Sequence, residues 1–161
     1  MSLQDLAPPT IEGYTAWVYS VMGVPDNVLP EDSIYIQMSY DIAFEIVNRY
    51  IWCANPGVFT VAVYNLAGDY LVNIAQDDPN AVPPPDNATT YWADLRGSLN
   101  LNSFVPGLVN NAADQGTSAG LQLLKSMENL TLGDLQTLKT PWGRIYMGIA
   151  QSVGSMWGWT P

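Results

Sequence analysis

Among the side chains of this 161-residue chain that could take part in catalysis, carboxylates are the most frequent. The chain contains no histidine, the commonest general base and metal ligand, and its one cysteine, Cys53, has no partner for a thiol mechanism. What remains is a carboxylate pair of the kind that glycosidases use, for which Asp77–Asp78 and Asp41 with Glu45 are the candidates. Because acids usually lie solvated on surfaces, we interpret both pairs as surface charge and predict no catalytic, cofactor-binding or metal-binding residue.

Charge is sparse and unevenly distributed along the chain. Only 12% of the residues are charged, while 48% are hydrophobic. Residues 1–95 hold twelve acids and one base, a net charge of −11, whereas residues 96–161 hold three acids and four bases, a net charge of +1. With no basic patch, the chain is not expected to grip nucleic acid. Apolar surface left over in a small domain with few charges indicates association with other chains.

Hydrophobic periodicity predicts a single, mainly α domain, a helical bundle. Thr10 is a plausible N-cap of the first helix, and Pro141 suits the first turn of the last. Gly68, inside a helix, indicates close helix packing. The helices are expected near residues 10–22, 32–53, 57–75, 90–99, 131–139 and 141–156.

The segment 32–53 carries two apolar rows at helical spacing, so we expect a helix covered on most sides and central to the fold. One row is Ile34, Met38, Ile42, Ile46 and Tyr50, and the other is Ile36, Tyr40, Ala43, Val47 and Ile51. Cys53 at its end is expected to be a buried small side chain.

Between and after the helices lie segments without a helical period. Residues 76–90 are polar and proline-rich and are expected to form a stiff connection. Residues 100–125 have no convincing period and are expected to form a long irregular loop or arm that contacts a neighbouring chain. The helical core is thus predicted over about 10–99 and 131–156, followed by an extended C-terminal tail, 157–161.

The aromatic C-terminal segment has two interpretations, both left open by the sequence. Trp142, Tyr146 and Trp157 at helical spacing are more often core residues. Trp159 lies close to the chain end, where a tryptophan indicates an interface. We predict that Trp142, Tyr146, Trp157 and Trp159 bind a partner, with Arg144 as a salt-bridge donor.

Nearly end to end, the chain resembles the head-to-tail adaptor (connector) proteins of tailed bacteriophages. The residues that carry the resemblance are structural signatures rather than an active-site motif. They are Trp17 with Met22-Gly23-Val24-Pro25, Ala62-Val63-Tyr64-Asn65-Leu66-Ala67-Gly68, Asp94-Leu95-Arg96, Phe104-Val105-Pro106-Gly107, and Leu138-Lys139-Thr140-Pro141-Trp142-Gly143-Arg144 to the end.

This resemblance implies a non-enzymatic structural protein of the virion neck, between capsid and tail, made in the cytoplasm of the bacterial host. It implies a homo-oligomeric ring, commonly a dodecamer, beneath the portal protein, with an extended loop and a C-terminal tail that reaches the portal. The implied partners are the portal, neighbouring copies, the next neck or tail protein, and DNA that passes through the channel without specific binding; no membrane is implied.

In such a ring, acids of the first half would face the DNA channel or solvent, because a negative wall repels the duplex and lets it slide. The acids expected there are Asp26, Glu31, Asp32, Asp77 and Asp78. The alternatives are another neck or tail-completion protein and, from a different class, a small carboxylate-dependent enzyme or a carbohydrate-binding module.

Overall fold

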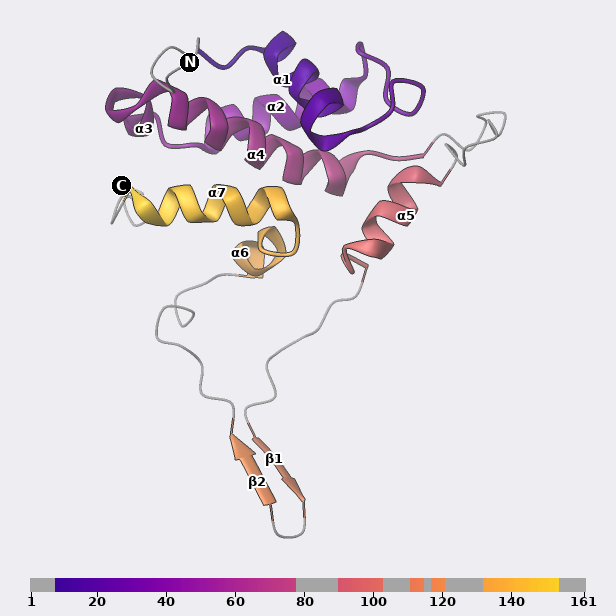
Figure 1. The fold of residues 1–161 in the computed structure, drawn as a ribbon, viewed down its shortest axis with the longest axis vertical. Coiled ribbons are helices and arrows are strands. Elements are labelled where there is room, and N and C mark those ends of the chain that lie inside the picture. Colours follow the sequence, from indigo (N-terminus) through magenta and orange to yellow (C-terminus); the bar gives the residue numbers. More distant parts are fainter. Residues whose placement is uncertain (1–7, 78–89, 103–110, 115–116, 121–131, 154–161) are drawn as a thin grey trace.

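The structure is a computed structural model that describes residues 8–77, 90–102, 111–114, 117–120 and 132–153 (Figure 1). It is mainly helical, which confirms the mainly α part of the predicted fold class. The elements, in chain order, are α1 (Ile11–Trp17), the π-helical turn η2 (Val18–Met22), α2 (Ile34–Ile46), α3 (Tyr50–Ala54), α4 (Pro56–Ile74), α5 (Tyr91–Ser98), β1 (Asn111–Asp114), β2 (Thr117–Gly120), α6 (Leu132–Thr137) and α7 (Pro141–Ser152).

Helix α4 is the centre of the bundle, because both α2 and α7 pack along it (Figure 1). It begins at Pro56, where a missing N–H costs nothing, and the Asn55 side chain accepts hydrogen bonds from the N–H groups of Gly57 (3.0 Å) and Val58 (3.2 Å). Buried residues occur on nearly every turn of the helix. The predicted helix 57–75 is therefore confirmed, and it occupies the central place that was predicted for the segment 32–53.

The N-terminal helix lies close against α4 at Gly68, as the glycine predicted. A Cβ atom at this position would lie 3.0 Å from Cζ3 of Trp17 and 3.2 Å from Sδ of Met22. The same helix is capped by Thr10, whose hydroxyl accepts the Gly13 N–H at 3.0 Å. The missing side chain at Gly68 thus lets the Trp17 and Met22 side chains pack directly on the α4 backbone, which helps to bury this end of the core.

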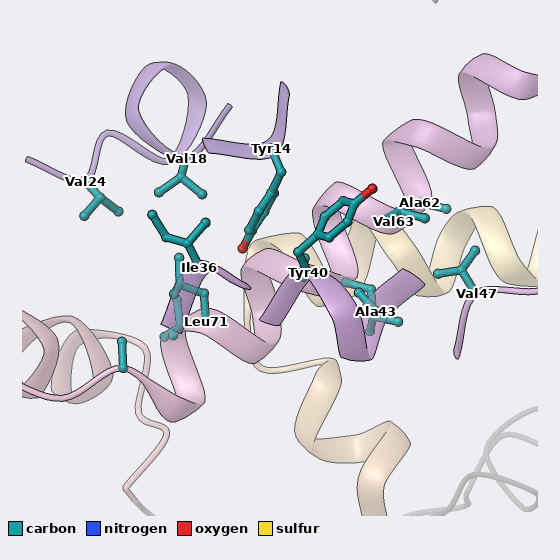
Figure 2. Packing of buried hydrophobic residues seen from close by; sticks show 14 of the residues in the cluster. Tyr14, Val18, Val24, Ile36, Tyr40, Ala43, Val47, Ala62, Val63 and Leu71 are labelled. Carbon is teal, nitrogen blue, oxygen red and sulfur yellow. The ribbon is translucent and has the colours of Figure 1, made fainter. Parts of the chain in front are cut away.

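Aromatic and aliphatic side chains from α1, α2 and α4 form the main hydrophobic core (Figure 2). Tyr14 is fully buried, and its hydroxyl lies 3.1 Å from the Ser39 hydroxyl on α2. The Tyr40 hydroxyl donates to the Pro9 carbonyl oxygen at 2.7 Å, which ties the segment before α1 to α2. The hydroxyl groups of both tyrosines are thus hydrogen-bonded, while their rings fill the core.

The single helix predicted over 32–53 is wrong, because the chain breaks between α2 and α3. Val47 has an extended backbone (φ −65°, ψ 125°), and its side chain is buried. Asn48 then accepts the Tyr50 N–H with its side-chain oxygen at 2.9 Å. This local bond competes with the helical pattern, as asparagine side chains often do, and it starts α3 in a new direction.

Of the two apolar rows on α2, only one is buried, so α2 lies at the edge of the bundle and not at its centre. Ile36, Tyr40 and Ala43 face the core. The other row faces outward, and we call it the α2 aliphatic row. Its members and their exposed fractions are Ile34 (66%), Met38 (45%), Ile42 (37%) and Ile46 (52%). Tyr50, which continues the spacing on α3, is 68% exposed.

The interval 100–125, expected to be irregular, contains regular structure where it is described. Strands β1 and β2 pair antiparallel, with Asn111 opposite Gly120 and Asp114 opposite Thr117, and in Figure 1 the pair lies apart from the helices. Its residues are small, so hydrophobic alternation could not reveal the strands. Residues 103–110, 115–116 and 121–125 lie outside the described part.

The corner between α6 and α7 depends on Gly143, and a substitution there tests the packing of α7. A Cβ atom at Gly143 would lie 1.9 Å from the Thr137 carbonyl oxygen, whereas one at Gly148, on the same helix, would meet nothing within 4 Å. We expect Gly143→Ala to lower the free energy of unfolding by about 2–3 kcal/mol, because backbone must move. Chemical denaturation followed by circular dichroism measures the change.

The matched control is Gly148→Ala, which should leave stability unchanged or raise it by about 0.5–1 kcal/mol through helix propensity. Equal stabilities for the two alanine variants would contradict the close contact at this corner.

Candidate functional site: the α4–α7 junction and the exposed faces

A buried polar link joins α4 to the start of α7. Asp69 on α4 is 3% exposed, and Thr140, the N-cap of α7, is fully buried. The Thr140 hydroxyl donates to Oδ1 of Asp69 at 2.5 Å and accepts the Gly143 N–H at 2.9 Å. One hydroxyl therefore satisfies a buried carboxylate and a free N–H of the first helical turn at once.

Burial raises the pKa of Asp69 to about 6, and the hydrogen bond from Thr140 opposes that rise. A carboxyl group with a pKa in this range can exchange a proton near neutral pH, which is a property of many general acids and bases. Asp69 also stands on the wall of a cavity. The Thr140 hydroxyl, however, holds one of the Asp69 oxygens at the start of α7, which gives the carboxylate a structural role.

The cavity has a volume of about 490 Å³ and is bounded by α4, α6, α7 and the last residue of α2. Besides Asp69, its lining includes Asn73, Asp134 and Tyr146. Burial raises the pKa of Tyr146, and the neighbouring Tyr70 and Asp134 raise it further. The lining combines these polar groups with apolar side chains that include Ile46, Leu66 and Met147, a mixture that is common in ligand pockets. Within the described residues, no three metal-ligating side chains of the His, Cys, Asp and Glu types gather.

Three of the predicted partner-binding residues lie on α7. Trp142 and Tyr146 are half-buried and pack against the core, as the core interpretation of these rings predicts. Arg144 is exposed, and its guanidinium donates to the carbonyl oxygens of Leu138 (3.4 Å) and Lys139 (3.5 Å). A cation at these carbonyls complements the end of α6. Trp157 and Trp159 lie outside the described residues, so their docking role stays a prediction.

Three of the predicted channel-facing acids gather in the exposed loop between η2 and α2. Asp26, Glu31 and Asp32 are all exposed. Burial raises the pKa of Tyr19, and the charges of Glu31, Asp26 and Asp32 raise it further. The acids form a compact negative patch, which we call the 26–32 acidic patch. That it faces DNA stays a prediction.

Asp77 has a structural role, because it caps α5. Its carboxylate accepts the N–H groups of Trp92 (2.8 Å) and Ala93 (2.9 Å). In return, Arg96 of α5 donates to the carbonyl oxygens of Val72 (2.9 Å) and Ala75 at the end of α4. An acid thus meets a helix N-terminus and a base meets a helix C-terminus. Asp78 lies outside the described residues.

The other carboxylate pair proposed from sequence is solvated surface charge, as interpreted. Asp41 is exposed, and both of its carboxylate oxygens accept from the Gln37 amide (2.8 and 2.9 Å). Glu45 is exposed and pairs with Arg49 at 3.4 Å. An exposed i,i+4 pair of this kind contributes only a few tenths of a kcal/mol.

A second, apolar hollow of about 370 Å³ lies beside α3. Phe44, Arg49, Trp52, Cys53 and Phe59 are among its lining residues, and the rings of Trp52 and Phe59 meet edge to face at 5.5 Å. Cys53 is exposed, which corrects the expectation that it is buried. The break before α3 is the reason, since it turns Tyr50–Ala54 away from the direction that a continuous helix would have given them.

Sequence reasoning missed Asp69 and the outward direction of the α2 aliphatic row. A signal for Asp69 was present, because it is the one acid within the otherwise apolar and neutral helix 57–74. No comparable signal separated the two rows of α2, since both have the same spacing and the same residue types.

Comparison with known proteins gave no match to a family model, to a curated protein or to a solved structure. In the described part of the chain, no helix combines the length and the apolar character that crossing a lipid bilayer requires.

The raised pKa of Asp69 predicts a stability that falls as pH rises. The folded state holds the proton up to about pH 6, whereas the unfolded chain releases it near 3.8, so folding is favoured below this window and loses free energy through it. We expect Asp69→Asn, which keeps an oxygen for Thr140, to remove this dependence.

The measurement is the free energy of unfolding of both proteins at several pH values. Between about pH 4 and pH 7 the wild type should lose up to about 3 kcal/mol relative to the variant, and the contributions of the other acids cancel in the difference. A difference that does not change with pH would show that Asp69 titrates normally.

Proposed function

We propose that this chain is a structural protein of the neck of a tailed bacteriophage, a head-to-tail adaptor. In this proposal, copies of the chain form a homo-oligomeric ring beneath the portal protein and line the channel through which DNA passes. A neighbouring role in the same structure, such as that of another neck or tail-completion protein, is the nearest alternative.

The proposal rests on the structural role of the residues that carry the resemblance to adaptor proteins. Gly68 allows Trp17 and Met22 to lie against α4, and Thr140 and Gly143 build the buried start of α7. The residues shared with the adaptors therefore fix how helices pack. Such a signature is typical of a protein whose task is to hold a shape in an assembly, because an enzyme signature would gather on a reaction site.

The distribution of charge supports the channel. The 26–32 acidic patch lies on one loop, exposed and compact. A negative surface in a lumen repels phosphates, so DNA passes without being held, whereas lysines at the same place would bind it.

The segment around β1 and β2 and the C-terminal tail complete the proposal. In Figure 1 the strand pair lies apart from the helices, and in this proposal it belongs to an arm that contacts a neighbour or the next neck protein. The tail, with Trp157 and Trp159, is proposed to reach the portal. Tryptophans dominate the binding energy of many interfaces.

Asp69 favours one rival from a different class, a small carboxylate-dependent enzyme. It has a raised pKa and lines a cavity together with Asp134. The oligomeric state separates the two proposals, because the enzyme should work as a monomer. An adaptor in which Asp69 is replaced by asparagine should still join heads to tails.

Removal of residues 157–161 tests the proposed role of the tail. We expect the truncated chain to stay soluble and folded and to lose its attachment to the portal, since the tryptophans supply the anchor. Circular dichroism and a pull-down with the portal protein measure the two effects. If the truncated chain unfolds, the tryptophans belong to its own core. If it still joins heads to tails, the proposed role of the tail in portal binding is wrong.

Charge substitutions in the 26–32 acidic patch test the channel. Neutral side chains (Asp26→Asn, Glu31→Gln and Asp32→Asn together) should slow genome ejection from intact particles, and lysines at the same three positions should slow it further, because repulsion of the duplex gives way to attraction. Ejection rates in vitro at several salt concentrations provide the measurement. Equal rates for all three particles would place this patch away from the DNA.

A further inference from the structure

The outward face of α2 consists of two parallel rows of side chains. One is the α2 aliphatic row, and the other is a polar row that runs beside it along the same helix. Gln37, Asp41 and Glu45 form the polar row; Gln37 and Asp41 are joined by hydrogen bonds, and Glu45 pairs with Arg49, which follows the break after α2. An apolar row with charges along its edge is the pattern of a helix that packs against another chain.

The exposed area of the aliphatic row is large for a monomer. Four aliphatic side chains exposed by 37–66% present roughly 400 Å² of apolar surface, which is within the size range of the largest patches on soluble monomers. A stable interface covers about 800 Å² on each partner, with an apolar centre and a polar rim. The row and its polar neighbour therefore supply the centre and part of the rim of one such interface.

The outward face of α7 has properties that complement this surface. Ile145 is 48% exposed, and Arg144 beside it brings a positive charge. At Gly148, one turn further, the space for a side chain is empty, so the backbone of another helix can approach closely. The face is thus short, apolar at its centre and positive at its edge.

We infer that the α2 face of one copy packs against the outward face of α7 in the next copy, with the aliphatic row on Ile145 and Gly148 and with Arg144 near Asp41. This inference rests on the proposed function and names the contact that builds the ring. Such a contact is head-to-tail, because it joins two different surfaces. Each copy has both an α2 face and an α7 face and can therefore bind a neighbour on either side. A series of copies joined in this way forms a ring when the rotation from one copy to the next closes.

Electrostatics favours this arrangement over a symmetric pairing of two α2 helices. A symmetric pair would bring together two rows that each hold Asp41 and Glu45, near Glu31 and Asp32 at the start of each helix, and the one base beside them, Arg49, already pairs with Glu45 of its own chain. Like charges in a contact of this kind oppose association. The α7 face instead presents Arg144 from the half of the chain whose net charge is positive.

The first experiment measures self-association of the full chain by light scattering coupled to size exclusion. We expect Ile42→Glu to weaken association at least about tenfold, because a charge replaces a residue at the centre of the contact. The matched control is Val21→Glu, which changes a valine that is 61% exposed and lies on η2, away from the row. It should associate like the wild type.

Charge reversal then identifies the partner surface. Asp41→Arg and Arg144→Glu should each weaken association, and the double variant should regain most of it, since the pair is restored with opposite signs. A double variant that associates no better than the single variants would overturn the assignment of the α7 face.

The remaining outcomes are also decisive. If Ile42→Glu unfolds the isolated chain, the row is covered by the chain itself and the inference is wrong. If Ile42→Glu associates normally but no longer binds the portal, the row belongs to the portal. If wild type and both glutamate variants associate equally, the ring uses another face and the proposed function stands. A wild type that stays monomeric overturns the inference, and it overturns the neck function as well only if particles lacking the protein still join heads to tails.

Discussion

The buried hydroxyl of Thr140 is the interaction on which the C-terminal half of the fold depends. It connects the Asp69 carboxylate in the middle of α4 with the first free N–H of α7, and so fixes where α7 starts. A hydrogen bond to a charged group contributes about 1.5–3 kcal/mol, but it offsets only part of the cost of burying the carboxylate, since the pKa of Asp69 remains raised to about 6. The link therefore adds little net stability, but it permits only one position for the helix. The contact of Gly143 with the Thr137 carbonyl follows from that position.

Both α2 and α7 pack along α4; α2 also contacts α1 and α7 also contacts α6, and each of the two helices keeps one face outward. For α7 this costs little, because Ile145 is the one large apolar side chain among its exposed positions, and the others are Arg144, Gly148, Gln151 and Ser152. For α2 the same geometry leaves aliphatic side chains in water. Exposed apolar side chains in such a row lose the stabilisation of burial, about 25 cal/mol per Å². A subunit with this surface is incomplete on its own, which is the property expected of a part of a ring.

Sequence patterns predicted the helices well where local chemistry decides them. Thr10, Asn55–Pro56 and Thr140–Pro141 are strong start signals, and the structure uses each of them. The break at Val47–Arg49 was missed because an apolar period continues across it, and a local bond from Asn48 outweighs the period. Which row of α2 is buried could not be predicted, since two rows of equal character differ only in what lies beside them. The same limit applies to Asp69, whose role depends on a threonine 71 residues later in the chain.

The division of charge between the two halves of the chain bears on how copies can associate. A half with a net charge of −11 repels its own kind, and this repulsion grows with every copy that is added. A head-to-tail contact places acidic α2 against the α7 face of the other half, so each contact in the proposed ring joins unlike charges. The acids of the 26–32 patch take no part in that contact and keep their full negative field. The inferred contact thus lets one chain associate through its helices and still present a repulsive surface to DNA, because the two tasks use different elements.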